Sequence, residues 1–286
     1  STELEALKQE MKELRQITQT LVDETSDLKT GFNYTTVDTG KSHSGLGSAA
    51  SKVYYSKSPL SIGGYGEMYY ADTKGSGTDK TTLDVYRFVP YIGYKFSDNI
   101  ILNAELEFEH GGIENDDGTA EGGEVVLEFM YLDFLINPHV NIRVGHFLMP
   151  MGLINERHEP TLFTTVQRPD TTKYIIPTTW HESGVMVYGD IIENLSYKVA
   201  GVSALQTGVN GSKWIRNGRG GSFAQTDPNL GFVARLDYTG INGFLVGSSA
   251  YYAPSSNGNN SETTIVDLHG DYKIKGARVY GAYAQT

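Results

Sequence analysis

The sequence predicts an antiparallel transmembrane β-barrel preceded by a short N-terminal α-helical coiled coil. Apolar and polar residues alternate in segments of about ten residues from residue 60 onward, and the connections between these segments alternate between short and long. A heptad pattern of apolar residues occupies residues 1–29. Strands of about ten residues that alternate lipid-facing and interior side chains are typical of barrels that cross a membrane.

The composition agrees with a protein made of many strands. The 286 residues include 19 Tyr, 11 Phe and 33 Gly but only 9 Pro, and no apolar run is long enough for a transmembrane helix. A mean hydropathy of -0.33 also suits a barrel, because interior residues dilute the apolar ones. The net charge of -11 excludes nucleic acid as a partner. The absence of Cys excludes disulfides and thiolate metal sites.

The N-terminal segment carries a narrow apolar seam. Thr18 and Thr25 fill two positions of the heptad register, and the flanking positions are mostly polar. A single helix cannot bury so narrow a stripe, so we expect residues 1–29 to form a parallel, trimeric coiled coil in the periplasm. A monomeric helix docked on the barrel is the alternative. The trimerisation residues are Leu4, Leu7, Met11, Leu14, Leu21 and Leu28.

Residues 30–59 are rich in Gly, Ser and Thr and show no sustained period of two or of 3.6. This pattern predicts a linker between the coiled coil and a barrel that spans residues 60–286. A disordered linker is the default expectation. Its length leaves open that part of it folds back into a cavity.

Eleven segments have the length and alternation of strands. In Ile101–Glu109, one face consists of Leu102, Ala104, Leu106 and Phe108, and the other carries Asn103, Glu105, Glu107 and Glu109. In residues 86–96, Tyr86, Phe88, Pro90, Ile92, Tyr94 and Phe96 share a face opposite Arg87 and Lys95. The remaining candidates are 60–71, 124–136, 140–148, 182–190, 195–204, 230–238, 244–253, 263–272 and 277–285.

The predicted connections divide into two classes. Short ones are expected at 97–99, 137–139, 191–194, 239–243 and 273–276, and long ones at 72–85, 110–123, 149–181, 205–229 and 254–262. Short periplasmic turns and longer external loops are typical of outer-membrane barrels. Because eleven strands leave an open edge that lipid does not tolerate, we expect C-terminal strands beyond those present here.

Three segments in the same order resemble the phosphate-selective porin O and P superfamily, over about residues 44–205. They are Ser61–Glu67, Gly145–Pro160 and Ile175–Glu182. The resemblance implies a homotrimeric barrel of about sixteen strands in the outer membrane of a Gram-negative bacterium. It implies passive diffusion of small ions or polar solutes, no cofactor, and a third external loop folded into the lumen. Residues 149–181 join the fifth and sixth strands, where such a loop belongs.

The charge of the predicted lumen face differs from the charge expected of a phosphate-selective channel. A phosphate channel requires Arg and Lys along its lumen, whereas the clearest predicted lumen face here carries Glu105, Glu107 and Glu109. Phosphate selectivity is therefore not carried over. Arg87 and Arg143 are predicted to face inward, and they either line the pore or neutralise these glutamates.

The predicted constriction loop carries mixed charge that would orient polar solutes at the narrowest point of the pore. Pairing with the barrel wall, which would hold the loop inward, is the alternative role for about half of these residues. The residues are Glu156, Arg157, His158, Glu159, Arg168, Asp170 and Lys173.

Other site chemistries have weaker support in the sequence. His158 has no second histidine at a ligand spacing, so no metal site is predicted. No serine lies in a nucleophile elbow, so catalysis is not expected, although a lipase-type outer-membrane enzyme stays an alternative. A trimeric surface adhesin is another alternative, but adhesin anchors usually follow the stalk, whereas here the strands follow the coiled-coil pattern.

Overall fold

The computed structural model describes residues 5, 8–18, 42–75, 77, 79–111, 123–160, 162, 168, 170–206, 215–220, 228–256 and 261–286. The chain divides into two compact units, Ser1–Gly40 and Lys41–Thr286. In the described part of the chain, no helix has the length and apolar character needed to span a membrane.

In the first unit, residues 8–18 are helical, as the heptad pattern predicts. Their side chains are exposed, including Met11 and Leu14 of the seam. Gln9 donates a hydrogen bond to Glu13 one turn later. The other seam residues, Leu4, Leu7, Leu21 and Leu28, lie outside the described residues, so the coiled coil stays a prediction.

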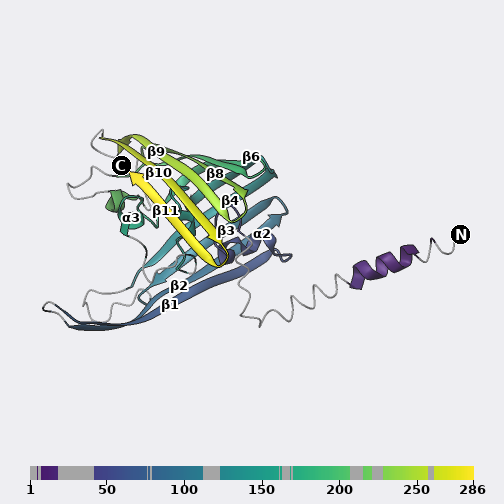
Figure 1. Ribbon diagram of the computed structural model, residues 1–286, viewed down its shortest axis with the longest axis horizontal. Coiled ribbons are helices and arrows are strands. Elements are labelled where there is room, and N and C mark those ends of the chain that lie inside the picture. The colour runs from purple at the N-terminus through teal and green to yellow at the C-terminus, as the bar shows by residue number, and fades with distance from the viewer. Residues whose placement is uncertain are drawn as a thin grey trace. The chain divides into compact units, whose positions relative to one another are not determined.

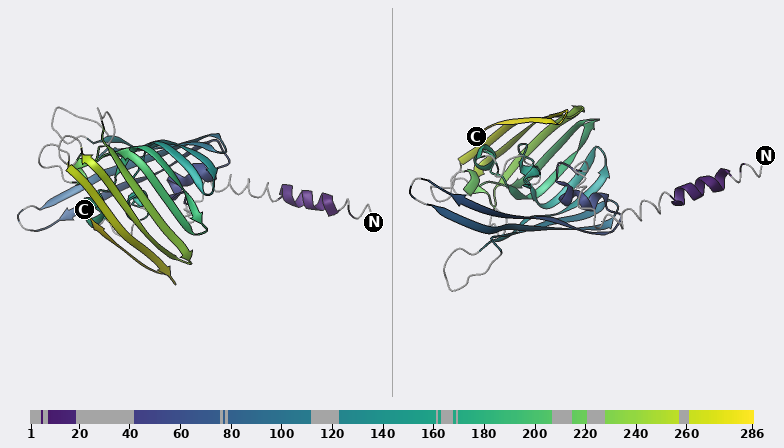
Figure 2. Two further views of the ribbon diagram at one scale, coloured as in Figure 1. Left: turned by 90° about the horizontal axis from the view of Figure 1, so that it is seen from above. Right: turned by 60° about the horizontal axis from the view of Figure 1, so that its bottom comes forward.

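The second unit contains one antiparallel sheet in which eleven strands lie side by side in chain order (Figure 1). All eleven segments predicted as strands are strands, which confirms the predicted antiparallel all-β fold class for this unit. The strands are β1 (Leu60–Thr73), β2 (Lys80–Ser97), β3 (Ile100–Glu109), β4 (Val125–Asn137), β5 (Val140–Leu148), β6 (His181–Ile192), β7 (Leu195–Ser203), β8 (Leu230–Ile241), β9 (Phe244–Ser256), β10 (Ser261–Ile274) and β11 (Ala277–Gln285). The sheet is curved but not closed, since β1 and β11 are its two edges (Figure 2).

The first hairpin is longer than predicted. Residues 72–85 were expected in a loop, but β1 continues to Thr73 and β2 begins at Lys80. A bulge in this hairpin interrupts the alternation of apolar and polar residues in β2: Glu67 pairs with Arg87, whereas Tyr69 pairs with Asp84. Leu83 and Val85 are exposed before the bulge, and Phe88 is exposed after it. Tyr86, predicted to share a face with Phe88, is instead half-buried against Arg87.

Short and long connections lie at opposite ends of the sheet, as predicted. Two-residue turns define the short-turn end, at 98–99, 138–139, 193–194, 242–243 and 275–276. The remaining connections define the long-loop end, where Figure 1 also shows α3 (Asp170–Tyr174). Positive φ angles at Asn194, Gly243, Lys275 and Gly276 suit the tight turns of antiparallel hairpins.

The two faces of the sheet differ in chemistry. The convex face exposes apolar side chains, including Ile62, Phe88, Ile92, Met130, Val144, Val185, Val199, Phe232, Val246, Val266 and Leu268. The concave face buries charged ones, including Arg87, Glu105, Glu107, Glu128, Asp133, Arg143, Lys198, Arg235, Asp267 and Asp271. This distribution is the reverse of that in a water-soluble sheet, whose solvated face is polar.

Helix α2 (Ser48–Tyr55) packs on the concave face against β1, β2 and β3. Glycines in the strands allow the close approach, because a Cβ on Gly93 would lie 2.5 Å from Cβ of Val53. Asn103 of β3 donates a hydrogen bond of 2.8 Å to the carbonyl of Ala50. Residues 42–55 therefore fold back against the sheet, which is the alternative that the length of the linker left open, and they differ from the disordered linker expected by default.

Candidate functional site on the concave face

The two ends of the segment after β5 are joined by hydrogen bonds. The amide of Met149 donates to the carbonyl of Trp180 at 2.9 Å. Asn155 fixes the same pair: its amide nitrogen donates to both carbonyls at 2.7 Å, and its side-chain oxygen accepts from the amide of Trp180 at 2.8 Å. Met149, Met151 and Asn155 are fully buried. These hydrogen bonds close the base of the segment. Residues 149–160, which we call the inner segment, lie against the concave face of the sheet.

Gly152 anchors the inner segment to β8 and β9. Its amide donates to Oγ of Ser249 at 3.0 Å, and its carbonyl accepts from Nη1 of Arg235 at 2.5 Å. Its φ of +66° is a left-handed conformation, and a Cβ there would lie 2.5 Å from Cδ1 of Ile176. Both the backbone angle and the space therefore favour glycine at this position.

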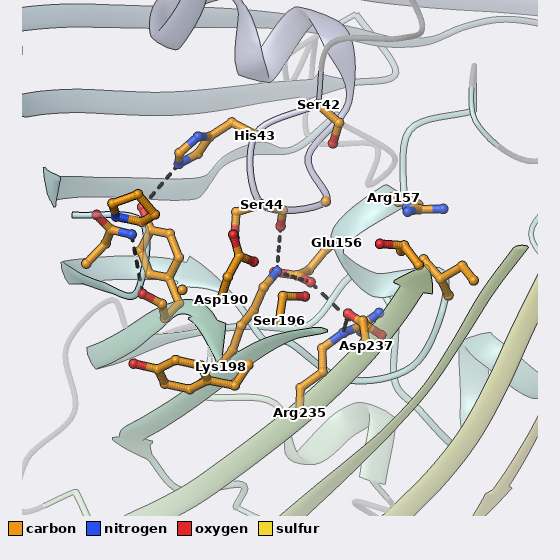
Figure 3. Close-up of a pocket in the computed structure, with 18 of the residues that line it drawn as sticks. Ser42, His43, Ser44, Glu156, Arg157, Asp190, Ser196, Lys198, Arg235 and Asp237 are labelled. Carbon is orange, nitrogen blue, oxygen red and sulfur yellow. Dashed lines mark hydrogen bonds and ion pairs between the residues drawn. The ribbon is translucent and has the colours of Figure 1, made fainter. Parts of the chain in front are cut away.

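Glu156 and Lys198 form the central ion pair. Nζ of Lys198 in β7 lies 2.6 Å from both carboxylate oxygens of Glu156 and also donates to the carbonyl of Ser44 at 2.5 Å (Figure 3). Arg235 lies 3.9 Å from the same carboxylate. Both members of the pair are buried. One ammonium group therefore joins the sheet, the inner segment and the chain just before α2.

These residues line a cavity of about 380 Å³ toward the short-turn end of the concave face (Figure 3). Its wall combines polar residues of opposite charge, among them Glu156, Arg157, Asp190, Lys198 and Asp237. A cavity lined in this way suits water, ions and small polar solutes better than apolar ligands.

Helix α2 is held by a buried polar cluster. Arg143 of β5 makes two hydrogen bonds of 2.8 Å to Asp133 of β4, and its guanidinium lies 3.9 Å from the ring centroid of Tyr131. The hydroxyl of Tyr54 donates to the same Asp133. His43 stacks on Tyr54 with ring centroids 3.5 Å apart, and burial lowers the pKa of His43. Arg143 therefore faces inward, but Asp133 satisfies its charge.

Arg87 lies among three carboxylates. Its guanidinium is 2.9 Å from Glu107, 3.2 Å from Glu67 and 4.0 Å from Glu109. Three carboxyl groups therefore surround one guanidinium group. Glu67 was not among the predicted site residues, although its strand partner in the sheet is Arg87.

His158 and Glu105 meet at the other end of the inner segment. Nε2 of His158 lies 3.4 Å from Oε1 of Glu105 and 2.8 Å from Oε2 of Glu128, a residue of β4 that sequence analysis did not select. Although burial alone would lower it, the Glu128 and Glu105 carboxylates raise the pKa of His158 well above its ordinary value. The ring of His158 therefore lies between two buried carboxyl groups.

The predicted constriction residues do not form one group. Glu156 and Arg157 face β7, β8 and β10, with Arg157 3.9 Å from Asp271, whereas His158 faces β3 and β4. Glu159 is buried, and a Cβ on Gly47 would overlap its carboxylate, so it lies at the start of α2. Asp170 is exposed and Lys173 half-buried in α3. Arg168 donates to the carbonyl of His158 at 3.3 Å.

The lipase alternative can be examined at Ser249, Asp267 and His269. The hydroxyl of Ser249 donates to Asp267 at 2.6 Å and accepts from Gly152, while His269 contacts the carboxylates of Asp267 and Asp237. A nucleophilic serine requires a base as its hydrogen-bond acceptor, usually a histidine. Here the acceptor of the serine proton is the carboxylate, and the serine anchors the inner segment.

Comparison with known protein sequences gives one similar protein and no family. No family model matches the chain. A protein of Aquifex aeolicus (strain VF5), described only as uncharacterized, is 36% identical over 251 residues, which are 85% of this chain and 57% of that protein. The chain thus spans little more than half the length of this relative.

The chain is similar to several solved structures of outer-membrane proteins. OmpF of Salmonella typhi, solved in complex with daunomycin, has a TM-score of 0.51 and 12% identity over 79% of this chain and 65% of its own. The outer-membrane channel DcaP of Acinetobacter baumannii has a TM-score of 0.39 and 14% identity over 80% and 79%. The likeness to OmpF shows a fold of the outer-membrane porin type. Membership of the phosphate-selective porin O and P superfamily stays a prediction.

Proposed function

We propose that this chain forms part of a water-filled channel in the outer membrane of a Gram-negative bacterium, through which small ions and polar solutes diffuse passively. The observation that supports this proposal is the distribution of side chains on the sheet, which is the reverse of that in a water-soluble sheet. Apolar side chains such as Phe88 and Phe232 are exposed on the convex face, and charged ones such as Arg143 and Lys198 are buried on the concave face. A barrel in lipid requires this arrangement.

The inner segment is the proposed constriction. It is tied to β8 and β9 at Gly152, to β7 at Glu156, and to the β3 and β4 side at His158, so it runs across the concave face. Charged groups on such a segment and on the opposing wall would set the preference for ions. Helix α2 adds a second obstruction toward the short-turn end, which the proposal places in the periplasm.

The assembly and the orientation belong to the same proposal. Residues 1–29 would form a periplasmic trimeric coiled coil, residues 30–59 would connect it, and residues 60–286 would contribute to a homotrimeric barrel in contact with lipid. The heptad seam and the exposed Met11 and Leu14 support self-association.

Single-channel recording on the full-length protein in planar bilayers tests this function. A folded protein, recognised by its heat-dependent mobility on a detergent gel, should give stepwise conductance. The same protein lacking residues 156–173 should give larger steps, because the proposed constriction is removed. A folded full-length protein without conductance would reject the channel, and equal steps from both proteins would place the segment away from the narrowest point.

A further inference from the structure

Three buried side chains from separate parts of the chain converge on one point of the concave face. They are Glu105 of β3, Glu128 of β4 and His158 of the inner segment, with exposed fractions of 0%, 4% and 2%. One carboxylate oxygen from each glutamate and one ring nitrogen all lie within 4.8 Å of one another. No two of these residues are neighbours in the sequence.

The polar atoms at this point are incompletely satisfied by the described residues. Oε2 of Glu105, Oε2 of Glu128 and both ring nitrogens of His158 are buried, and none makes a hydrogen bond there. Nε2 of His158 is 2.8 Å from Glu128 and 3.4 Å from Glu105, but neither contact has the alignment of a hydrogen bond. Buried carboxylates in this state need a cation nearby.

We propose that Glu105, Glu128 and His158 bind a divalent first-row metal ion, with Zn²⁺ as the representative case. Metal–nitrogen and metal–oxygen bonds of about 2.1 Å place adjacent ligand atoms about 3.0 to 3.4 Å apart in octahedral or tetrahedral shells. The observed contacts of 2.8 and 3.4 Å are close to these spacings. One imidazole with two carboxylates suits Zn²⁺, Fe²⁺ or Mn²⁺ better than Ca²⁺, which takes oxygen ligands.

The surroundings favour a fixed site. The hydroxyl of Tyr91 donates to Oε1 of Glu105 at 2.9 Å and so orients the carboxylate, as an outer-shell partner does in metal sites. Arg168 donates to the carbonyl of His158, which holds the backbone and leaves the ring toward the wall. A bound metal would fasten the inner segment to β3 and β4, opposite the Glu156–Lys198 pair.

A proton on His158 is the competing source of positive charge. An imidazolium group between two carboxylates would also compensate them, without any metal. The two cases differ in the number of metal ions bound per chain and in the absorption spectrum with Co²⁺. Only a metal site retains an ion and gives Co²⁺ absorption bands that depend on the ligands.

Metal binding to the full-length protein in detergent tests the proposal without any need for channel activity. Protein stripped with EDTA is given Zn²⁺ and desalted, and its metal content is measured. We expect one ion per chain, binding weakened roughly tenfold or more in E128Q and H158A, and Co²⁺ absorption bands that disappear in H158A. H110A is the matched control, because His110 is exposed and pairs with Asp84 instead.

Each outcome decides the question. Retention of no ion by the unchanged protein would assign the positive charge to the His158 proton and overturn the metal site. Equal binding by E128Q and the unchanged protein would place the ion elsewhere and overturn it too. Since E128Q preserves the shape of the side chain, it gives the result if H158A does not fold, with heat-dependent mobility as the check on folding.

Discussion

Nζ of Lys198 lies 2.6 Å from both carboxylate oxygens of Glu156, so a buried ion pair ties the inner segment to strand β7. The same ammonium donates to the carbonyl of Ser44. Two separate stretches of chain on the concave face therefore depend on one positive charge.

Replacing Lys198 with Met should destabilise the protein by about 3 to 5 kcal/mol, because it leaves the carboxylate of Glu156 buried beside only the more distant Arg235. Urea unfolding in detergent micelles measures this loss. The double variant K198M/E156Q removes both charges and should regain part of the stability. E193Q, which neutralises an exposed carboxylate in a turn, is the control. A K198M variant as stable as E193Q would contradict the assigned role of the pair.

A second prediction concerns Gly93 and helix α2. A Cβ at Gly93 would lie 2.5 Å from Cβ of Val53, so G93A should push α2 away from β2, toward the middle of the lumen, and narrow the channel. Single-channel conductance should fall, and adding V53G should return it toward the original value. G281A is the matched control, since Gly281 also lies in a strand but has open space around its Cβ position. Unchanged conductance in G93A would show that α2 does not limit flow.

The strands could be predicted from the sequence because their signal is local. The alternation in Ile101–Glu109 places successive side chains on opposite faces whatever the rest of the chain does. The same reasoning missed the start of β2, because the bulge opposite Met68 shifts the alternation by one residue near Tyr86. It placed Glu105 and Glu107 inward, and both are buried on the concave face.

The remaining features depend on contacts that form only when the sheet curves. Helix α2 has no apolar stripe strong enough to mark it, and Gly93 and Gly63 in the sheet make room for Val53 and Ala49 of the helix. The partner of His158 is Glu128, which ordinary strand alternation does not distinguish from other inward acids. Asp170 and Lys173 belong to the same loop as His158, but a loop of this length can place its parts far from one another.

A third prediction concerns residues 1–29. Fused to a monomeric partner protein, this segment should form trimers, because Met11 and Leu14 are exposed on the described part of the helix and gain burial only by association. Analytical ultracentrifugation gives the mass. A fusion with Leu14→Asp, which places a charge in the seam, should be monomeric at the same concentration. If the unchanged fusion is also monomeric, the alternative of a docked single helix is favoured.

The last prediction is that the carboxylates around Arg87 bias the channel toward cations. Glu67, Glu107 and Glu109 lie within 4.0 Å of the Arg87 guanidinium, so the acidic groups outnumber the positive group that they contact. Mobile cations from the solution compensate such an excess, and a pore wall of this kind favours their passage. Glu105 is expected to contribute less, because His158 and Tyr91 already contact it.

The reversal potential of the full-length channel in a salt gradient measures this bias. E67Q/E109Q should shift the potential toward anions, because it removes two carboxylates and keeps the guanidinium of Arg87. R87Q should shift it the other way, because it removes a positive charge and keeps the carboxylates. Opposite shifts from two changes at the same place exclude a general effect of altered folding or pore width. If neither variant moves the potential while conductance persists, the ions do not pass near Arg87, and selectivity must be sought along β7 and β8, where Lys198 and Arg235 lie.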